Sequence, residues 1–239
     1  MLQPPPIVLS FAANDPSGGA GIQADTLTIA SLGCHPLPIL TAITVQDTAG
    51  VEDILPLDPE WVVDQARAVL EDMPVQVFKT GLLSSTEMIV AIAEIVSDYP
   101  NIPLVIDPVL ASGRGDELGN EDTIQAMQEL LIPQATVLTP TSIEAHRLIN
   151  DNDHMFSLEQ CAQELVDMGC ENVLITGTHE NTAQVVNTLI NSSGIVRLDT
   201  WERFEQSYHG SGCTLASAIA DELEADWKYI TVKQATGNA

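Results

Sequence analysis

Short apolar runs alternate along the chain with longer stretches whose apolar residues recur at helical spacing. The first run, Ile7–Ala12, leads through a glycine-containing loop to a predicted helix from Gly21 to Leu32, which together make a strand–helix unit. Most of the remaining runs are too continuously apolar to have one solvated face, and such strands are typical of parallel sheets. These predicted strands are Leu37–Ile43, Val75–Lys79, Leu104–Ile106, Thr136–Leu138 and Val173–Ile175.

Helix starts and one break in the rhythm complete the predicted architecture. Capping boxes at Ser84–Glu87 and Ser157–Gln160 predict the start of two helices. The region Thr182–Leu198 instead reads as a hairpin, because two apolar runs flank the turn residues Asn191–Gly194. Since no linker or internal repeat divides residues 1–239, we expect one α/β domain, a mostly parallel sheet with helices on both faces. Ligands of such domains bind beyond the carboxyl ends of the strands.

Charge excludes some classes of partner. The chain of 239 residues has 8 Lys and Arg against 34 Asp and Glu, a formal net charge of −26. Eight scattered cations cannot build a surface for nucleic acid or for an anionic membrane. No apolar run approaches the ~20 residues of a membrane helix. No basic residue precedes Arg67, so we expect no signal peptide. The four cysteines lack C-x-x-C spacing, so we expect no structural zinc and a cytoplasmic location.

The segment His209–Cys213 is the sharpest local motif. Its glycines allow the backbone to present the N–H groups of Gly210, Ser211, Gly212 and Cys213 at a helix N-terminus, where an anion is favoured. The thiolate of Cys213 would be favoured there too, so this residue could act as a base or nucleophile. A capped helix start with a small buried cysteine explains the spacing equally well.

A second glycine loop, Asn14–Gly21, joins the first strand to the first helix. It matches neither the Walker nor the Rossmann phosphate-binding pattern. Its glycines imply close backbone approach to a ligand, and a tight turn is the simpler alternative. Gln23 and Asp25 begin the following helix, and Gln46 follows the next strand, so all three could meet in one pocket. A carboxylate and an amide suit a heterocycle with an amine and ring nitrogens.

Two carboxylates lie at or shortly after predicted strand ends. Asp107 follows Leu104–Ile106, and Glu144 comes shortly after Thr136–Leu138. Such a pair could hold Mg²⁺ together with water and phosphate oxygens, as in phosphoryl-transfer sites. The Asp-Pro pair at 107–108 is also explained by a simple turn.

Together these segments resemble the hydroxymethylpyrimidine/phosphomethylpyrimidine kinases of thiamine synthesis, within the ribokinase-like superfamily. The resemblance runs in order from about residue 7 to residue 225, and its signature segments are Asp15–Asp25, Thr41–Gln46, Lys79–Leu83, Val105–Val109, Thr139–Glu144 and His209–Leu215. It implies a ribokinase-like three-layer α/β/α sandwich that forms a homodimer. It also implies ATP- and Mg²⁺-dependent phosphorylation of 4-amino-5-hydroxymethyl-2-methylpyrimidine to the monophosphate and then to the diphosphate.

The resemblance implies roles for individual residues. Gln46 and Asp25 would hydrogen-bond the pyrimidine, in a pocket lined by Gly18, Gly19 and Ala20. Cys213 would take the proton of the substrate hydroxyl group. The amides of Gly210–Cys213 would hold the transferring phosphoryl group, and Asp107 and Glu144 would lie near Mg²⁺ and the phosphates.

The chain departs from the family pattern on the nucleotide side. Thr141 stands where the family usually has Asn, Thr176 stands where it has a phosphate-contacting Lys, and the chain stops at Ala239, before a further helix that family members usually have. Arg114 and backbone amides are candidates to replace the missing Lys. A pyrimidine-binding protein with little or no kinase activity, and a related vitamin kinase such as a pyridoxal kinase, remain alternatives.

Overall fold

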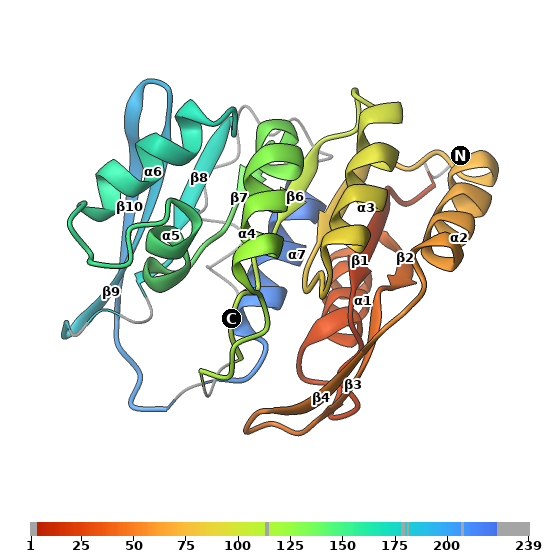
Figure 1. Cartoon of the computed structure of the whole chain (residues 1–239), viewed down its shortest axis with the longest axis horizontal. Helices are drawn as coiled ribbons and strands as arrows, with labels where there is room; N and C mark the ends of the chain where they lie inside the picture. The colour runs from red at the N-terminus through yellow and green to blue at the C-terminus, as the bar shows by residue number, and fades with distance from the viewer. Residues whose placement is uncertain (1–3, 113–114, 178–179, 181, 207, 224–239) are drawn as a thin grey trace.

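A computed structural model describes residues 4–112, 115–177, 180, 182–206 and 208–223. In these residues, eight strands form one sheet in the order β10-β9-β8-β7-β6-β5-β1-β2 (Figure 1). Neighbouring strands are parallel from β2 to β8, and β9 and β10 are antiparallel. The strands are β1 (Ile7–Ala12), β2 (His35–Leu40), β5 (Val77–Thr80), β6 (Leu104–Ile106), β7 (Val137–Leu138), β8 (Asn172–Ile175), β9 (Gln184–Asn191) and β10 (Gly194–Glu202).

Helices cover both faces of this sheet. Alternate residues of a strand point to opposite faces, so β1 sends Leu9 and Phe11 into one core and Val8 into the other. The Leu9 core is closed by α2 (Pro59–Asp72), α3 (Thr86–Asp98), α4 (Glu121–Ala126) with the turns that follow it, α5 (Ser142–Leu148) and α6 (Leu158–Asp167). The Val8 core is closed by α1 (Gly21–Leu32) and α7 (Ser211–Leu223). The expected three-layer α/β/α sandwich is therefore confirmed.

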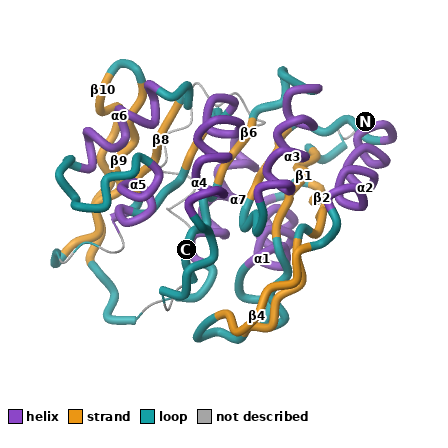
Figure 2. The backbone as a smooth tube through the Cα atoms, in the orientation of Figure 1, coloured by secondary structure: helices purple, strands orange, loops and turns teal. Residues whose placement is uncertain are grey.

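The predicted strand Leu37–Ile43 is confirmed only as far as Leu40, because the chain leaves the main sheet at Thr41. Thr41 is buried; its N–H donates to the Ala12 carbonyl (3.0 Å) and its hydroxyl to the Leu82 carbonyl (2.9 Å). Beyond it, β3 (Ala42–Gln46) pairs antiparallel with β4 (Val51–Pro56) in a separate two-stranded sheet, seen at the bottom of Figure 2. The sequence pattern did not predict β4 because its side chains are exposed or half-buried and form no apolar run.

The structure also tests the predicted capping boxes and the predicted hairpin. The capping box at Ser157–Gln160 is confirmed, with both reciprocal hydrogen bonds present. The box predicted at Ser84–Glu87 is wrong by one residue: Ser85 is the N-cap, and its hydroxyl accepts from the Met88 N–H at 3.1 Å. The hairpin is confirmed as β9 and β10, which extend the sheet beyond β8. No helix in the described part of the chain has the length and apolar content that a membrane span requires.

Candidate active site

The predicted site residues that the structure describes lie along the carboxyl edge of the sheet, from the loop after β1 to Thr176 after β8. The chain continues from β1 to β2 on one side, whereas β5 pairs with β1 on the other side, so the strand order reverses at β1. Parallel α/β sheets bind ligands in the crevice at such a point. The glycine loop Asn14–Gly21 follows β1 directly, and Gly81 and Asp107 follow β5 and β6.

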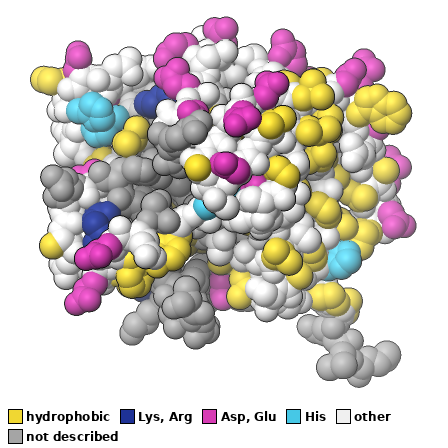
Figure 3. All heavy atoms as spheres, turned by 90° about the horizontal axis from the view of Figure 1, so that it is seen from below, with side chains coloured by type: hydrophobic (Ala, Val, Ile, Leu, Met, Phe, Trp, Pro, Cys, Tyr) yellow, Lys and Arg dark blue, Asp and Glu magenta, His cyan; other side chains and the backbone are white. Residues whose placement is uncertain are grey.

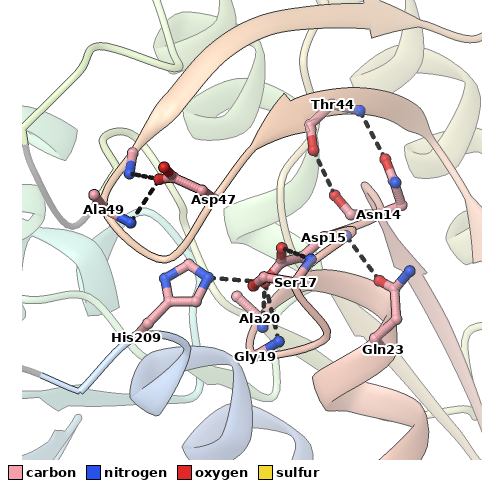
Figure 4. Close-up of polar contacts among 11 residues, drawn as sticks. Asn14, Asp15, Ser17, Gly19, Ala20, Gln23, Thr44, Asp47, Ala49 and His209 are labelled. Carbon is pink, nitrogen blue, oxygen red and sulfur yellow. Dashed lines mark hydrogen bonds and ion pairs between the residues drawn. The ribbon is translucent and has the colours of Figure 1, made fainter.

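Asp15 organises the first glycine loop (Figure 4). Its carboxylate accepts from the Ser17 N–H (2.8 Å) and hydroxyl (2.8 Å), and from the N–H groups of Gly19 (3.1 Å) and Ala20 (2.7 Å). The Asp15 N–H donates in turn to Gln23 Oε1 at 2.7 Å, so Gln23 braces this loop. Burial opposes the charge of Asp15, but hydrogen bonds from Ser17, His209 and the backbone lower its pKa to about 2.

The second glycine loop rests on the first. His209 Nε2 lies 2.8 Å from Asp15 Oδ2, across 194 positions of sequence (Figure 4). Gly210 has a φ of +77°, and a Cβ there would collide with the carbonyl oxygen of Gly19. A Cβ on Gly19 would lie 2.8 Å from the His209 ring. Glycine is thus required at position 210, where the two backbones touch, and a side chain at position 19 would displace the His209 ring. Through its contact with Asp15, His209 orients the second glycine loop against the first.

The N-terminus of α7 faces the same crevice. Its first α-helical hydrogen bond runs from the Thr214 N–H to the Gly210 carbonyl at 3.0 Å, so the N–H groups of Gly212 and Cys213 have no acceptor within the helix. Ser211 and Gly212 are exposed. A Cβ on Gly212 would lie 3.9 Å from Asp107 Oδ1. Backbone donors and the Asp107 carboxylate are therefore neighbours.

Cys213 is half-buried and hydrogen-bonded to Asp107. Burial and the negative charges of Asp107 and Asp25 raise the pKa of its thiol, although Lys79 opposes this shift. The direction is opposite to the favoured thiolate expected from a helix N-terminus, because burial and the two carboxylates outweigh the effect of the helix end. Without bound ligand, the cysteine is a thiol at neutral pH.

A buried ion pair lies beneath the loops. Lys79 Nζ of β5 is 2.8 and 2.9 Å from the two carboxylate oxygens of Asp25 in α1, and Ser217 of α7 donates its hydroxyl to Asp25 Oδ1 at 2.8 Å. None of the three is exposed. Burial disfavours the charge of Lys79, but the carboxylate of Asp25, with Cys213 and Asp107, raises its pKa. The network joins the two helices of one layer to the sheet.

Lys79 is a residue to which sequence reasoning gave no role. A single lysine at the end of an apolar run, in a chain with eight cations, was the available signal. The predicted pyrimidine ligand Asp25 turns out to contact Lys79 and Ser217 inside the protein.

Asp107 and Glu144 are both buried and interact electrostatically. The Oδ2 atom of Asp107 has no hydrogen-bond partner, and burial and Asp25 raise the pKa of this carboxyl against the effects of Lys79 and Cys213. Glu144 closes the capping box of α5 with Thr141 and also accepts from the Leu110 N–H at 3.2 Å. Burial and the charge of Asp107 raise its pKa to about 7. Two buried carboxyl groups with raised pKa values and one unpartnered oxygen form a site that fits Mg²⁺.

The two substituted residues on the nucleotide side are neighbours. Thr141 and Thr176 pair in an isolated parallel bridge, and the Ser142 N–H donates to the Thr176 carbonyl at 3.3 Å. Thr141 is the N-cap of α5, a role that Asn also performs well. Arg203 Nη2 donates to the carbonyl of Gly177, next to Thr176, at 3.0 Å, which places a cation that sequence reasoning did not consider at this edge. Arg114 lies outside the described residues.

The β3–β4 sheet reaches the first glycine loop. Thr44 donates its N–H to Asn14 Oδ1 (2.7 Å) and its hydroxyl to the Asn14 carbonyl (2.8 Å), as Figure 4 shows. Gln46 ends β3 two residues later and is half-buried. Gly18 and Ala20 are half-buried and Gly19 is exposed, so a ligand can approach this part of the loop.

Comparisons with known proteins agree with this geometry. A family model described as phosphomethylpyrimidine kinase matches residues 15–238. The chain is 40% identical over 217 residues to a thiamine biosynthesis bifunctional protein of Geobacter sulfurreducens, covering 90% of this chain but 44% of that protein. It is 35% identical over 214 residues to a hydroxymethylpyrimidine/phosphomethylpyrimidine kinase of Salmonella typhimurium, covering 89% of this chain and 80% of that one. The chain thus spans less than half of the Geobacter relative.

The fold of this chain is also similar to those of solved kinase structures. A phosphomethylpyrimidine kinase from Clostridium difficile 630 superposes with a TM-score of 0.80 at 30% identity, covering 97% of this chain and 95% of that chain. A Staphylococcus aureus pyridoxal kinase in complex with ADP gives a TM-score of 0.84 at 30% identity, covering 97% and 84%. The sandwich is therefore ribokinase-like. Because the family match runs from the Asp15 loop through the His209–Cys213 loop that rests on it, this chain belongs to the phosphomethylpyrimidine kinase family.

Proposed function

We propose that the chain transfers the γ-phosphoryl group of ATP to the hydroxymethyl group of 4-amino-5-hydroxymethyl-2-methylpyrimidine, and then adds a second phosphoryl group to the monophosphate. The observation that carries the proposal is the seating of the His209–Cys213 loop on the Asp15 loop. This contact brings α7 donors, a cysteine and a buried carboxylate to one crevice in a chain of this kinase family. The ADP complex of the related pyridoxal kinase supports ATP as donor.

In the first transfer, the substrate oxygen forms a bond to the γ-phosphorus while the bond from that phosphorus to the oxygen of the leaving ADP breaks. Cys213 accepts the hydroxyl proton, and the N–H groups of Gly210, Ser211, Gly212 and Cys213 stabilise charge on the transferring oxygens. For this, Cys213 must lose its own proton. Lys79 and the positive end of α7 favour that loss, and neutralisation of Asp107 by a cation would favour it further.

Pyrimidine recognition belongs to the edge formed by the glycine loop and β3. We assign Gln46 to hydrogen-bond the ring and Gly18, Gly19 and Ala20 to line its pocket, which their partial exposure supports. A direct contact of Asp25 with the pyrimidine stays a prediction of the family resemblance. Its contacts with Lys79 and Ser217 support a second role, that of holding α1 and α7 in place.

Asp107 and Glu144 would hold Mg²⁺, with the unpartnered Oδ2 of Asp107 as the most available ligand atom. The ion, when bound, would neutralise charge on the phosphates. Thr176 and Arg203 are assigned to the phosphate side of the nucleotide site, next to Thr141. Arg114 keeps the predicted role of a phosphate-contacting cation.

We propose that the protein is a homodimer that uses the β3–β4 sheet as its interface. Ile43, Val45 and Leu55 on this sheet are between 44% and 62% exposed, and Trp61 at the start of α2 is 70% exposed. Exposed apolar residues in such a group are typical of surfaces buried between subunits. That residues 1–239 act as one kinase domain, and that the protein is cytoplasmic, stay predictions.

The test is an assay with the purified chain, the hydroxymethylpyrimidine and Mg-ATP, in which both phosphorylated products are quantified. We expect Cys213→Ala to lower kcat by about 10²–10⁴-fold. Cys170→Ala, which alters a buried cysteine beside the first residue of β8, should retain activity. Binding of the pyrimidine without product would instead favour a binding protein, and a higher kcat/KM for pyridoxal would favour a pyridoxal kinase. Equal activities of Cys213→Ala and the parent chain would remove the assigned base.

A further inference from the structure

Three buried side chains of different chemistry meet between α5 and α6, among residues to which the proposed kinase reaction gives no role. His146 lies on α5, Asp151 on the loop after it and Cys161 on α6. His146 Nδ1 is 2.8 Å from Asp151 Oδ2 and 3.4 Å from Cys161 Sγ. The nitrogen, oxygen and sulfur atoms all lie within 4.8 Å of one another.

The hydrogen on His146 Nδ1 cannot account for the contacts of this nitrogen with both Asp151 and Cys161. Asp151 accepts from the N–H groups of Met155 (2.8 Å) and Phe156 (2.9 Å), so it acts as an acceptor, and His146 Nδ1 must donate to it. A nitrogen that carries this hydrogen cannot also accept the thiol hydrogen of Cys161. The close contact between Cys161 Sγ and His146 Nδ1 is then not a hydrogen bond from the thiol to the ring. A cation bound between the three atoms would be coordinated by all of them.

The loop that carries Asp151 is already arranged around the group. Two residues of this loop have a left-handed backbone conformation, Asn150 with a φ of 58° and His154 with a φ of 51°. The ring of His154 packs against the ring of His146, with 4.2 Å between the ring centroids. Donors from two helices and their connecting loop therefore converge before any ion binds.

We propose that His146 Nδ1, Asp151 and Cys161 Sγ bind a transition-metal ion of the Zn²⁺ class, with a water molecule as the fourth ligand. Zn²⁺ takes nitrogen, oxygen and sulfur at about 2.0–2.3 Å in a tetrahedron, which sets ligand atoms roughly 3.3–3.6 Å apart. The sulfur–nitrogen distance of 3.4 Å already matches this spacing, and the nitrogen–oxygen contact of 2.8 Å would have to widen by roughly half an ångström.

The donor set separates this site from the kinase chemistry. Mg²⁺ binds oxygen ligands and retains water, so a site with imidazole and thiolate donors selects against it. A bound ion would join α5, the loop and α6, and we assign it a structural role. The inference does not rest on the proposed function.

The probes are Zn²⁺ and Co²⁺, each added to the reduced full chain after treatment with EDTA and removal of the chelator. We expect one ion per chain. Co²⁺ should give an absorption band of thiolate-to-cobalt charge transfer, and Zn²⁺ should displace it. Cys161→Ser should abolish the band and weaken Zn²⁺ binding by more than about tenfold, since even loss of a residue behind a ligand costs about 10–100-fold.

Two matched controls locate the band. Cys213→Ser tests the cysteine beside Asp107, Cys170→Ser tests another buried cysteine, and both variants should keep the band. Asp151→Asn retains size and should weaken Zn²⁺ binding even if Cys161→Ser fails to fold. A parent chain without a thiolate band, a band lost in Cys213→Ser, or Zn²⁺ affinity unchanged in both Cys161→Ser and Asp151→Asn would each overturn the proposal.

Discussion

Single residues at this site act through several backbone groups at once. Asp15 is the clearest case: its carboxylate accepts from three N–H groups, one hydroxyl and His209, and thereby shapes the first glycine loop and seats the second. A short charged acceptor serves this purpose because backbone N–H donors in a tight turn converge on one point.

Asp15→Asn should destabilise the folded chain by roughly 1–3 kcal/mol at neutral pH, because hydrogen bonds to a charged acceptor are lost. The pKa of Asp15 is lowered to about 2. Its contribution is therefore present above the unfolded-state pKa, about 3.9, and is lost as the pH falls towards 2. Urea unfolding of parent and variant from pH 7 to pH 3 measures this. The difference in free energy of unfolding should shrink below about pH 4, and an undiminished difference at pH 3 would contradict the assignment.

Thr176→Lys tests the nucleotide side. A lysine at this edge should contact phosphate and lower the Kd of ATP roughly fivefold, which corresponds to about 1 kcal/mol. Isothermal titration calorimetry with Mg-ATP gives the value. Thr200→Lys on β10 is the control, because it adds the same charge at an exposed strand position. It separates the effect of a local phosphate contact on ATP affinity from the effect of a changed net charge. Equal affinities of Thr176→Lys and the parent would mean that residue 176 does not face phosphate.

Elements are joined at this site by buried charge. The Lys79–Asp25 pair with Ser217 joins α1 and α7 to β5. These contacts fix the position of α7, and with it the position of the helix N-terminus at the crevice. Forming a buried ion pair costs desolvation free energy, because both charges leave water. Removing one partner costs more, because it leaves the other charge buried without a partner.

Lys79→Met should therefore lower the free energy of unfolding by about 3–5 kcal/mol. The double variant Asp25→Asn/Lys79→Met should recover part of that loss, because no uncompensated charge remains. Arg67→Met, which removes the exposed pair with Asp98, is the control and should cost no more than about 1 kcal/mol. Urea unfolding measures all three. A double variant less stable than Lys79→Met would show that packing, and not charge pairing, dominates.

The whole molecule combines strong acidity with an apolar edge. Figure 3 shows acidic side chains spread over one face with few basic ones among them, while apolar side chains gather on the side where β3 and β4 lie in Figure 1. At physiological ionic strength the screening length is about 8 Å, so distant carboxylates repel ATP weakly, and local donors decide its binding. The same screening lets two copies with a charge of −26 each approach through an apolar patch.

Val45→Glu should convert the proposed dimer to monomers at micromolar concentration, because a charge on the exposed face of β3 would be buried in the interface. Leu198→Glu places the same charge on β10, where the leucine is similarly exposed, and should leave the mass unchanged. Light scattering after gel filtration compares the two. A monomeric parent chain, or equal masses for parent and Val45→Glu, would reject this interface.

The sequence by itself determined those features that depend on neighbouring residues. Runs such as Ile7–Ala12 and Leu104–Ile106, and the helix Gly21–Leu32, lie within one residue of their predicted bounds or match them, because periodicity and backbone sterics act locally. The two glycine loops were recognisable for the same reason: turns and helix starts are encoded within a few positions.

Only the tertiary structure decided which of these local features meet. The contact of His209 with Asp15, the pairing of Lys79 with Asp25 and the bridge between Thr141 and Thr176 all join distant segments, and depend on which strands lie side by side. The exit of the chain at Thr41 depends on acceptors from β1 and from the segment after β5. The raised pKa of Cys213 follows from burial and from carboxylates on other elements, and the residues next to position 213 in the sequence give no sign of either, because folding produces both.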